Sequence, residues 1–355
     1  MSMINGFTSE DADRLSDKEK RLVERRARLL GPAYRLFYEH PLHTVRGEGV
    51  WLYDEQGRRY LDAYNNVASV GHCHPRVVEA ISRQAGQLNT HTRYLQEGLL
   101  DYAEQLLGTF PEYLERVMFT CTGSEANDLA LRIARHATGG TGILVTRWAY
   151  HGVTSALAEL SPSLGDGVVR GNHVKLIDAP DTYRQPGAFL TSIREALAQM
   201  QQEGIRPAAL LVDTIFSSDG VFCAPEGEMA QAAALIRQAG GLFIADEVQP
   251  GFGRTGESLW GFARHGIVPD LVSLGKPMGN GHPIAGLVGR STLFDAFGRD
   301  IRYFNTFGGN PVSCQTAHAV LRVIREEQLQ QNAQRVGNYL RQGLQQLAQD
   351  FPLIG

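Results

Sequence analysis

From about residue 76 onward, the chain alternates between short apolar runs and longer amphipathic segments. The apolar runs, most of them bounded by glycine, are the candidate strands Val117–Thr120, Gly142–Thr146, Val174–Ile177, Ala208–Ile215, Leu242–Asp246 and Leu271–Leu274. The amphipathic segments between and after them are the candidate helices Glu125–His136, Ala188–Gln202, Glu228–Gln238 and Val312–Glu327. Short apolar strands separated by amphipathic helices are typical of a mostly parallel sheet covered on both faces. The pattern therefore predicts an α/β fold.

Both ends of the chain show other patterns. Residues 9–30 read as one charged helix with a possible capping box at Ser16 and Glu19, and residues 50–61 read as a β-hairpin around a turn at 54–57. Asn332–Gln349 is a final helix. We expect an N-terminal segment, 1–62, that contributes to a small domain, then a large domain, 63–310. Residues 311–355 would begin a C-terminal small domain that continues past Gly355.

Composition narrows the class of protein. The chain has 355 residues, of which 43% are hydrophobic and 20% charged, as in ordinary globular proteins. Its net charge of −4 argues against a nucleic-acid-binding protein. No run of about 20 apolar residues and no signal peptide is visible, which predicts no membrane partner. Four scattered cysteines favour a reducing compartment, so we expect a cytoplasmic protein.

Two patterns suggest ligands that the surrounding sequence does not support. Gly251–Gly256 fits the GxGxxG pattern of dinucleotide-binding folds, but an aromatic-rich loop follows where that fold needs a helix. The run His72-Cys73-His74 resembles a metal-ligand cluster, yet adjacent residues rarely converge on one ion and no further ligands lie nearby. We expect no metal site.

Three other features point to one kind of chemistry. Thr122–Asn127 joins a strand to a helix with small residues, which suits either a capped helix or a phosphate bound at the helix N-terminus. Asp246 ends a buried strand, at the edge where open parallel sheets bind ligands. Lys276 follows the next strand in a glycine-rich turn, and a buried lysine loses its charge and becomes a nucleophile. An amine, an anion and a phosphate site together are what pyridoxal 5′-phosphate (PLP) requires.

These features resemble the class III aminotransferase family, a group of PLP enzymes of fold type I. The matching motifs are Gly71–Pro75, Gly123–Asn127, Ala149–Gly152, Ala245–Gln249 with Gly251–Arg254, Gly275-Lys276 and Asn305–Pro311. The resemblance covers the whole chain apart from the first few dozen residues. It implies a PLP-dependent enzyme with a large domain and a smaller domain built from both termini.

The resemblance also implies how the cofactor ring is held. Lys276 would form the Schiff base with the cofactor aldehyde, and Asp246 would pair with the pyridine nitrogen. Gln249 would contact the ring hydroxyl, while Tyr150 stacks on one face of the ring and Val248 packs on the other. Lys276 and Asp246 are the predicted catalytic residues.

The phosphate site implied by the resemblance needs two subunits. Gly123 and Ser124 would hold the phosphate through backbone groups, and Thr306 of the neighbouring subunit would add a hydroxyl. The protein is therefore expected to be a homodimer with shared active sites.

Within the family, the segments 64–75, 275–283 and 303–306 are most similar to phospho-lyases acting on phosphoethanolamine and phosphohydroxylysine. Ornithine-type transaminases carry a gating glutamate where this chain has Ser218, and their carboxylate-binding arginine would lie after Gly355. We therefore favour a lyase that removes phosphate from a phosphorylated amino-alcohol, releasing aldehyde and ammonia. Its substrate phosphate would need a second anion site, for which Arg35, Asn65 and Asn66 are the candidates, although a surface arginine and turn asparagines explain them as well.

Two alternatives stay open at this point. The first is a class III transaminase that moves an amino group from a small amine or ω-amino acid to a keto acid. The second is a scaffold that has lost catalysis, against which the intact Lys276 and Asp246 argue.

Overall fold

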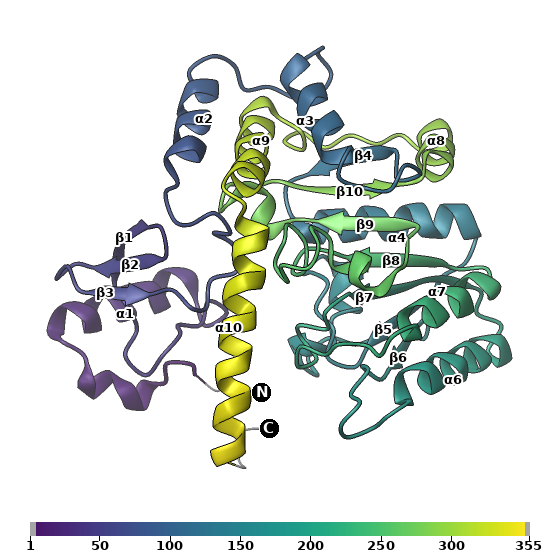
Figure 1. The fold of residues 1–355 in the computed structure, drawn as a ribbon, viewed down its shortest axis with the longest axis horizontal. Helices are drawn as coiled ribbons and strands as arrows, with labels where there is room; N and C mark the ends of the chain where they lie inside the picture. Colours follow the sequence, from purple (N-terminus) through teal and green to yellow (C-terminus); the bar gives the residue numbers. More distant parts are fainter. Residues whose placement is uncertain (1–4, 352–355) are drawn as a thin grey trace. The chain divides into compact units, whose positions relative to one another are not determined.

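The computed structural model describes residues 5–351, and their contacts divide the chain into two units (Figure 1). The first unit comprises residues up to Asn65 together with Gly71–His74, and the second comprises Asn66–Val70 and the chain from Pro75. This division reflects contacts within the chain, and the expected domain boundaries at 62/63 and 310/311 stay predictions.

The first unit contains two helical segments and a three-stranded antiparallel sheet. The single helix predicted over 9–30 is wrong at its start, because a 3-10 helix, η1 (Ser9–Arg14), precedes α1 (Asp17–Leu30). Ser16 lies between them in an extended conformation and forms the predicted capping box with Glu19, so a new helix begins there. The predicted hairpin is confirmed as β2 (Trp51–Asp54) and β3 (Arg59–Leu61), and β1 (Thr44–Glu48) pairs with β2.

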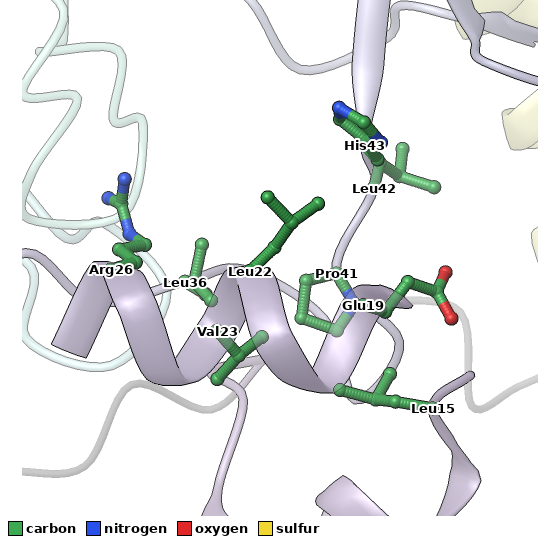
Figure 2. Close-up of a pocket in the computed structure, with 9 residues that line it drawn as sticks. All are labelled: Leu15, Glu19, Leu22, Val23, Arg26, Leu36, Pro41, Leu42 and His43. Carbon is green, nitrogen blue, oxygen red and sulfur yellow. The ribbon is translucent and has the colours of Figure 1, made fainter. Parts of the chain in front are cut away.

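A pocket lies along α1 in this unit (Figure 2). Its lining is mostly aliphatic, with Glu19, Arg26 and His43 among the side chains. None of the residues assigned to the cofactor belongs to this unit, so this pocket is not the candidate active site.

The second unit is built on a seven-stranded sheet with the order β4-β10-β9-β8-β7-β5-β6. The strands are β4 (Arg116–Thr120), β5 (Gly142–Thr146), β6 (Val174–Ile177), β7 (Pro207–Asp213), β8 (Leu242–Asp246), β9 (Leu271–Leu274) and β10 (Ala285–Gly289). Six of them match or nearly match the predicted strands. The seventh, β10, was not predicted, because glycines interrupt its short apolar run, and it alone runs antiparallel to both of its neighbours.

Helices pack on both faces of this sheet (Figure 1). The helices of this unit are α2 (Pro75–Ala85), α3 (Glu97–Leu107), α4 (Gly123–Thr138), α5 (Ser155–Ala158), α6 (Ala188–Gln202), α7 (Glu228–Gln238), α8 (Ser291–Asp300), α9 (Pro311–Glu326) and α10 (Leu329–Asp350). Of these, α10 contacts α9 and buries no residue, so it is not part of either layer. The predicted helices correspond to α4, α6, α7, α9 and α10, with ends that differ by at most three residues.

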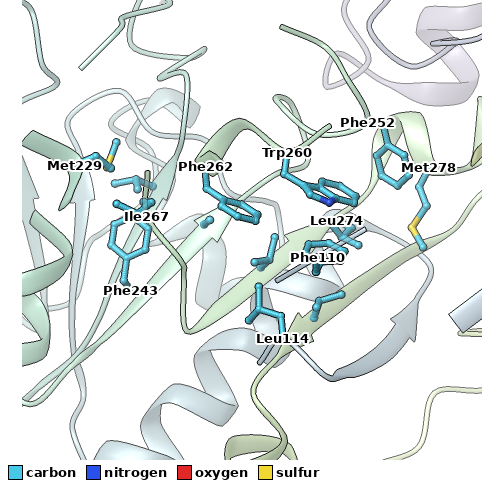
Figure 3. Packing of buried hydrophobic residues seen from close by; sticks show 14 of the residues in the cluster. Phe110, Leu114, Met229, Phe243, Phe252, Trp260, Phe262, Ile267, Leu274 and Met278 are labelled. Atoms are coloured by element: carbon cyan, nitrogen blue, oxygen red, sulfur yellow. The ribbon is translucent and has the colours of Figure 1, made fainter. Parts of the chain in front are cut away.

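Alternate residues of the strands divide the core into two clusters. In β5, Leu144 belongs to one cluster, whereas Ile143 and Val145 belong to the other. Since successive strand side chains point to opposite faces, these are the two faces of the sheet. The larger cluster takes in α2, α3, α6, α7 and α9 and includes the aromatic group around Phe110, Trp260 and Phe262 (Figure 3), and α4 and α8 contribute to the other. The predicted α/β fold with a mostly parallel, two-sided sheet is confirmed. Within residues 5–351, no helix has the length and apolar character needed to cross a membrane.

Candidate active site

Polar side chains meet where three neighbouring strands end. Asp213 ends β7 and is paired in register with Asp246 at the end of β8, which is in turn paired with Ser273 of β9. Lys276 follows β9 after Gly275 and begins the 3-10 helix η4 (Lys276–Gly279). The carboxyl ends of parallel strands lie at the same edge of a sheet, so the sheet itself assembles this group.

One pocket at this edge contains nearly all of the predicted cofactor residues. Its lining consists of Gly123, Ser124, Asn127, Tyr150, His151, Gly152, Asp213, Asp246, Val248, Gln249 and Lys276. Of the positions predicted to bind the cofactor, only Thr306 is outside this lining. Thr306 is exposed in the loop before α9, where a hydroxyl supplied to a neighbouring subunit would have to be. The roles of these residues stay predictions.

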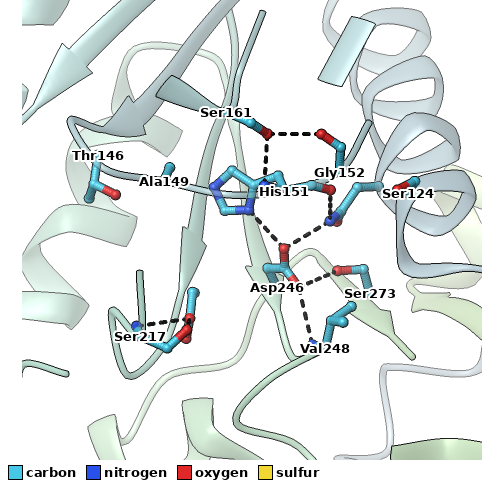
Figure 4. A network of polar contacts seen from close by, with 12 residues as sticks. Ser124, Thr146, Ala149, His151, Gly152, Ser161, Ser217, Asp246, Val248 and Ser273 are labelled. Carbon is cyan, nitrogen blue, oxygen red and sulfur yellow. Dashed lines mark hydrogen bonds and ion pairs between the residues drawn. The ribbon is translucent and has the colours of Figure 1, made fainter. Parts of the chain in front are cut away.

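A hydrogen-bond network fixes the Asp246 carboxylate (Figure 4). Its Oδ2 is 2.7 Å from His151 Nδ1 and accepts a hydrogen bond from Asn127 Nδ2 at 2.8 Å. Its Oδ1 accepts hydrogen bonds from Val248 N at 3.1 Å and Ser273 Oγ at 3.3 Å. The Asp246 side chain is 6% exposed, and no lysine or arginine pairs with it among the described residues. A buried carboxylate that is held in place by hydrogen bonds is suited to pair with a protonated pyridine nitrogen.

The N-terminus of α4 provides the expected anion site. Thr122 caps the helix by accepting a hydrogen bond from Glu125 N, so Gly123 and Ser124 are the first helical residues and their N–H groups have no partner in the helix. A Cβ at Gly123 would lie 2.9 Å from Val248 Cγ2. The absence of a side chain at this position is therefore what allows the start of the helix to approach the ring site.

Lys276 has an unusual backbone conformation and a shifted proton affinity. Its φ is +33°, outside the regions that residues other than glycine normally occupy. Burial lowers the pKa of the Lys276 amine, and the negative charges of Asp246 and Asp213 oppose that shift. A lysine with a lowered pKa is more often uncharged near neutral pH, and the neutral amine is the form that attacks an aldehyde or removes a proton.

The structure adds two acidic residues that the sequence analysis missed. Asp213 lines the pocket and accepts hydrogen bonds from Ile215 N and Ser217 N, and burial raises its pKa. Glu247 is fully buried and accepts hydrogen bonds from Thr214 Oγ1, Gly261 N and Phe262 N, and burial raises its pKa to about 7. Asp213 ends a strand just as Asp246 does, so the same argument from strand ends was available for it.

His151 and Asn127 were also missed as functional residues, although both lie in motifs that carry the family resemblance. The two are linked, because Asn127 Nδ2 also donates to the carbonyl oxygen of His151 at 2.9 Å. Asn127 is buried within α4, and a buried asparagine needs hydrogen-bond partners. The sequence signal that was overlooked is a polar asparagine on an otherwise apolar face of the helix.

The three candidates for a substrate anion site are divided between the two units. Arg35 and Asn65 belong to the first unit, whereas Asn66 belongs to the second and donates a hydrogen bond from Nδ2 to Gln249 Oε1. Their role toward substrate stays a prediction.

The dinucleotide-binding interpretation of Gly251–Gly256 is excluded by the local structure. This segment forms turns, and the next helical element is the short 3-10 helix η3 (Gly261–His265). The pattern therefore lacks the helix whose N-terminus would bind a pyrophosphate.

Comparison with known proteins identifies the family. The sequence profile of class III aminotransferases matches residues 37–355. The chain belongs to the class III aminotransferase family. It is 41% identical over 350 residues to an alanine–glyoxylate aminotransferase 2-like protein of Drosophila melanogaster, covering 94% of this chain and 71% of that protein.

Two further relatives carry the name of a lyase. The chain is 35% identical over 383 residues to ethanolamine-phosphate phospho-lyase homolog 1 of Caenorhabditis elegans, covering 100% of this chain and 82% of that protein. It is similar in structure to a phospholyase from Arthrobacter in complex with phosphoethanolamine, with 46% identity and a TM-score of 0.89 over 92% of this chain and 80% of that one.

The class III aminotransferase is thus a PLP-dependent enzyme of fold type I, as the sequence analysis predicted. When bound, PLP withdraws electrons from the carbon that carries the substrate amine and makes its C–H bond acidic. The residues at the pocket suit that group: Asp246 would face the pyridine nitrogen, the start of α4 would hold the phosphate and Lys276 would bind the aldehyde.

Proposed function

We propose that this enzyme is a phospho-lyase that eliminates phosphate from a small phosphorylated amino-alcohol such as phosphoethanolamine. The observation that carries the proposal is the similarity, at 46% identity, to the Arthrobacter phospholyase in complex with phosphoethanolamine. The relative from Caenorhabditis elegans supports it as well.

The side chains at the pocket suit the proton transfers that this reaction needs. Lys276, with its lowered pKa, takes a proton from the carbon that bears the amine. Asp246, held by four hydrogen bonds, would keep the pyridine nitrogen protonated. The bond between the neighbouring carbon and the phosphate oxygen then breaks. Phosphate leaves with the electron pair, and one water converts the resulting enamine into an aldehyde and ammonia.

Ser218 also supports the lyase. A transaminase that alternates between two differently charged substrates benefits from a glutamate that switches the charge of its carboxylate site. Ser218 is exposed and its hydroxyl carries no charge. A lyase with one substrate needs no such switch.

The second candidate function is a transaminase acting on a small amine or ω-amino acid. The observation in its favour is the relative named as an alanine–glyoxylate aminotransferase 2-like protein, at 41% identity. Both reactions share the removal of a proton by Lys276. They differ in whether phosphate leaves or the proton returns to the cofactor.

One experiment separates the two reactions. The purified, PLP-loaded enzyme is incubated with phosphoethanolamine alone, and phosphate, ammonia and aldehyde are measured. In parallel, it is incubated with β-alanine or alanine and a keto acid, and the new amino acid is measured. The lyase proposal expects equimolar phosphate and ammonia from the first reaction without any keto acid. Transamination without phosphate release would contradict it.

A further inference from the structure

The segment Asn66–Val70 belongs to the second unit and is hydrogen-bonded to two sides of the candidate active site. At one end, Asn66 Nδ2 donates to Gln249 Oε1 at 2.8 Å. At the other end, Val70 N donates to the side-chain oxygen of Asn280 at 3.0 Å. Gln249 lines the pocket, and Asn280 ends the turn that begins with Lys276. The segment therefore joins a residue of the pocket wall to the turn that carries the lysine.

Arg254 fixes the main chain of this segment. Its Nη2 donates to the carbonyl oxygen of Asn66 at 3.0 Å and to Ser69 Oγ at 3.2 Å. Hydrogen bonds from a guanidinium group are stronger than those between neutral groups. Arg254 thus holds the main chain of Asn66 in place, and the Asn66 side chain extends from this fixed position toward Gln249.

The direction of that contact decides what Gln249 presents to a ligand. A glutamine side chain has an acceptor oxygen at one end of its amide and a donor nitrogen at the other. Because Oε1 of Gln249 accepts from Asn66, its Nε2 is the end that remains for the pocket. The PLP hydroxyl is on the ring carbon next to the aldehyde, and in its ionised form it accepts hydrogen bonds.

We propose that Asn66 is a positioning residue that holds the Gln249 amide with its nitrogen toward the ring oxygen of the cofactor, and that Arg254 secures Asn66 in that role. Gln249 then donates a hydrogen bond that stabilises the ionised ring oxygen. If the Gln249 amide were reversed, its Oε1 would face the ring oxygen of the cofactor, and both are acceptors. The inference rests on the bound cofactor and is independent of whether a lyase or a transaminase reaction follows.

The test measures cofactor binding, so it does not depend on turnover. Apoprotein is titrated with PLP, and binding is followed by the absorbance of the bound cofactor, which is then titrated with pH. Asn66→Ala removes the restraint and is expected to weaken PLP binding about tenfold, the size expected for impairing one hydrogen bond to a charged oxygen. Asn66→Asp offers only acceptors, reverses the Gln249 amide and is expected to weaken binding by a further factor of about ten. Both variants raise the pH at which the ring oxygen of the bound cofactor ionises.

Two controls separate positioning from a general loss of structure. Asn338→Ala makes the same chemical change on α10, where Asn338 accepts from Arg341, and is expected to leave PLP binding unchanged. Gln249→Glu keeps an acceptor facing Asn66 but has no donor for the ring oxygen, so PLP binding should fall about tenfold.

The Gln249→Ala background supplies the decisive comparison. In that background, Asn66→Ala should cost no further PLP affinity, because there is no amide left to orient. The proposal is overturned if Asn66→Asp binds PLP as well as Asn66→Ala does, or if Asn66→Ala weakens binding equally with and without Gln249. It is also overturned if Gln249→Glu binds PLP as tightly as the wild type, because the end of the side chain that faces the ring oxygen would then not need to be a donor. A protein that binds PLP in this pattern but releases no phosphate would refute the proposed lyase and leave this inference standing.

Discussion

At the scale of single residues, three ionisable groups in or next to the pocket differ in their surroundings. Lys276 is desolvated, which lowers its pKa, and has a strained backbone. Asp246 is more deeply buried than Lys276 and receives hydrogen bonds at both oxygens. Glu247, its neighbour in sequence, is directed away from the pocket toward Thr214 and the backbone of η3. Asp246 ends β8 and Glu247 is the first residue after the strand, and the two carboxylates are held by different parts of the fold.

Replacing Lys276 by alanine is expected to abolish turnover and leave the fold intact. The change removes both the group that binds the cofactor covalently and the base. Borohydride treatment followed by peptide mass spectrometry should find the cofactor attached to Lys276 in the wild type and to no residue in Lys276→Ala. Covalent attachment at another lysine, or turnover at the wild-type rate, would contradict the assignment.

Replacing Asp246 by asparagine is expected to allow PLP binding while lowering the rate on the order of a hundredfold or more. A neutral amide cannot keep the pyridine nitrogen protonated, and loss of a charged partner costs a few kcal/mol. The rate is measured at saturating PLP, so that weaker binding is not mistaken for slower chemistry. A loss below about threefold would mean that another residue faces the nitrogen.

Glu247 makes stability depend on pH. Burial raises its pKa from 4.5 in the unfolded chain to about 7 in the folded protein, so the folded state binds its proton more tightly. Its contribution to the free energy of unfolding is therefore complete below pH 4.5 and is lost as the pH rises to about 7. Urea unfolding of the apoprotein across this range should show the decline.

Glu247→Gln is the matched variant for that measurement. It should remove the part of the decline that is due to Glu247 and lower stability by roughly 1–3 kcal/mol, because its NH₂ group opposes at least one of three donors. An unchanged pH dependence in Glu247→Gln would show that other groups cause it.

At the scale of elements, the contact between the start of α4 and the segment that follows β8 matters most. Gly123 and Val248 come from different elements and approach so closely that only glycine fits at 123. The same closeness brings the free N–H groups of the helix beside the ring site, where a phosphate needs them.

Gly123→Ala tests this contact. The new Cβ would lie 2.9 Å from Val248, so either the helix start or Val248 must shift. We expect PLP binding to weaken about tenfold, as when one hydrogen bond to a charged group is lost. Gly298→Ala in α8 is the matched control, because a Cβ there meets nothing within 4 Å. It should leave PLP binding unchanged and raise stability by roughly 0.5–1 kcal/mol, since alanine favours a helix over glycine. Equal PLP affinity in both variants would contradict the close-contact argument.

At the scale of the whole molecule, the proposed homodimer predicts that each phosphate site uses a residue from both subunits. If Thr306 serves the phosphate of the neighbouring subunit, Thr306→Ala removes one charge-assisted hydrogen bond, worth roughly 1.5–3 kcal/mol. PLP retention should then weaken about tenfold or more without unfolding, which equilibrium dialysis and circular dichroism together can measure.

Mixed dimers make the test sharper. When inactive Lys276→Ala subunits are combined with inactive Thr306→Trp subunits, one site of each heterodimer contains both changes and the other contains neither. Activity should therefore return in heterodimers isolated through two different affinity tags. Its absence would mean that each phosphate site is built within one chain.

Sequence patterns alone were enough to predict the fold class, most of the strands and helices, and the positions of Lys276 and Asp246 at or just after strand ends. These features follow from local patterns, because alternation and helical periodicity report burial within one element. The relations among distant residues were decided by the tertiary structure. Asp246 binds His151 across 95 residues and Asn127 across 119, and Asn66 reaches Gln249 across 183. No local pattern records such pairs, because a hydrogen bond between distant side chains depends on where the packed sheet and helices place them.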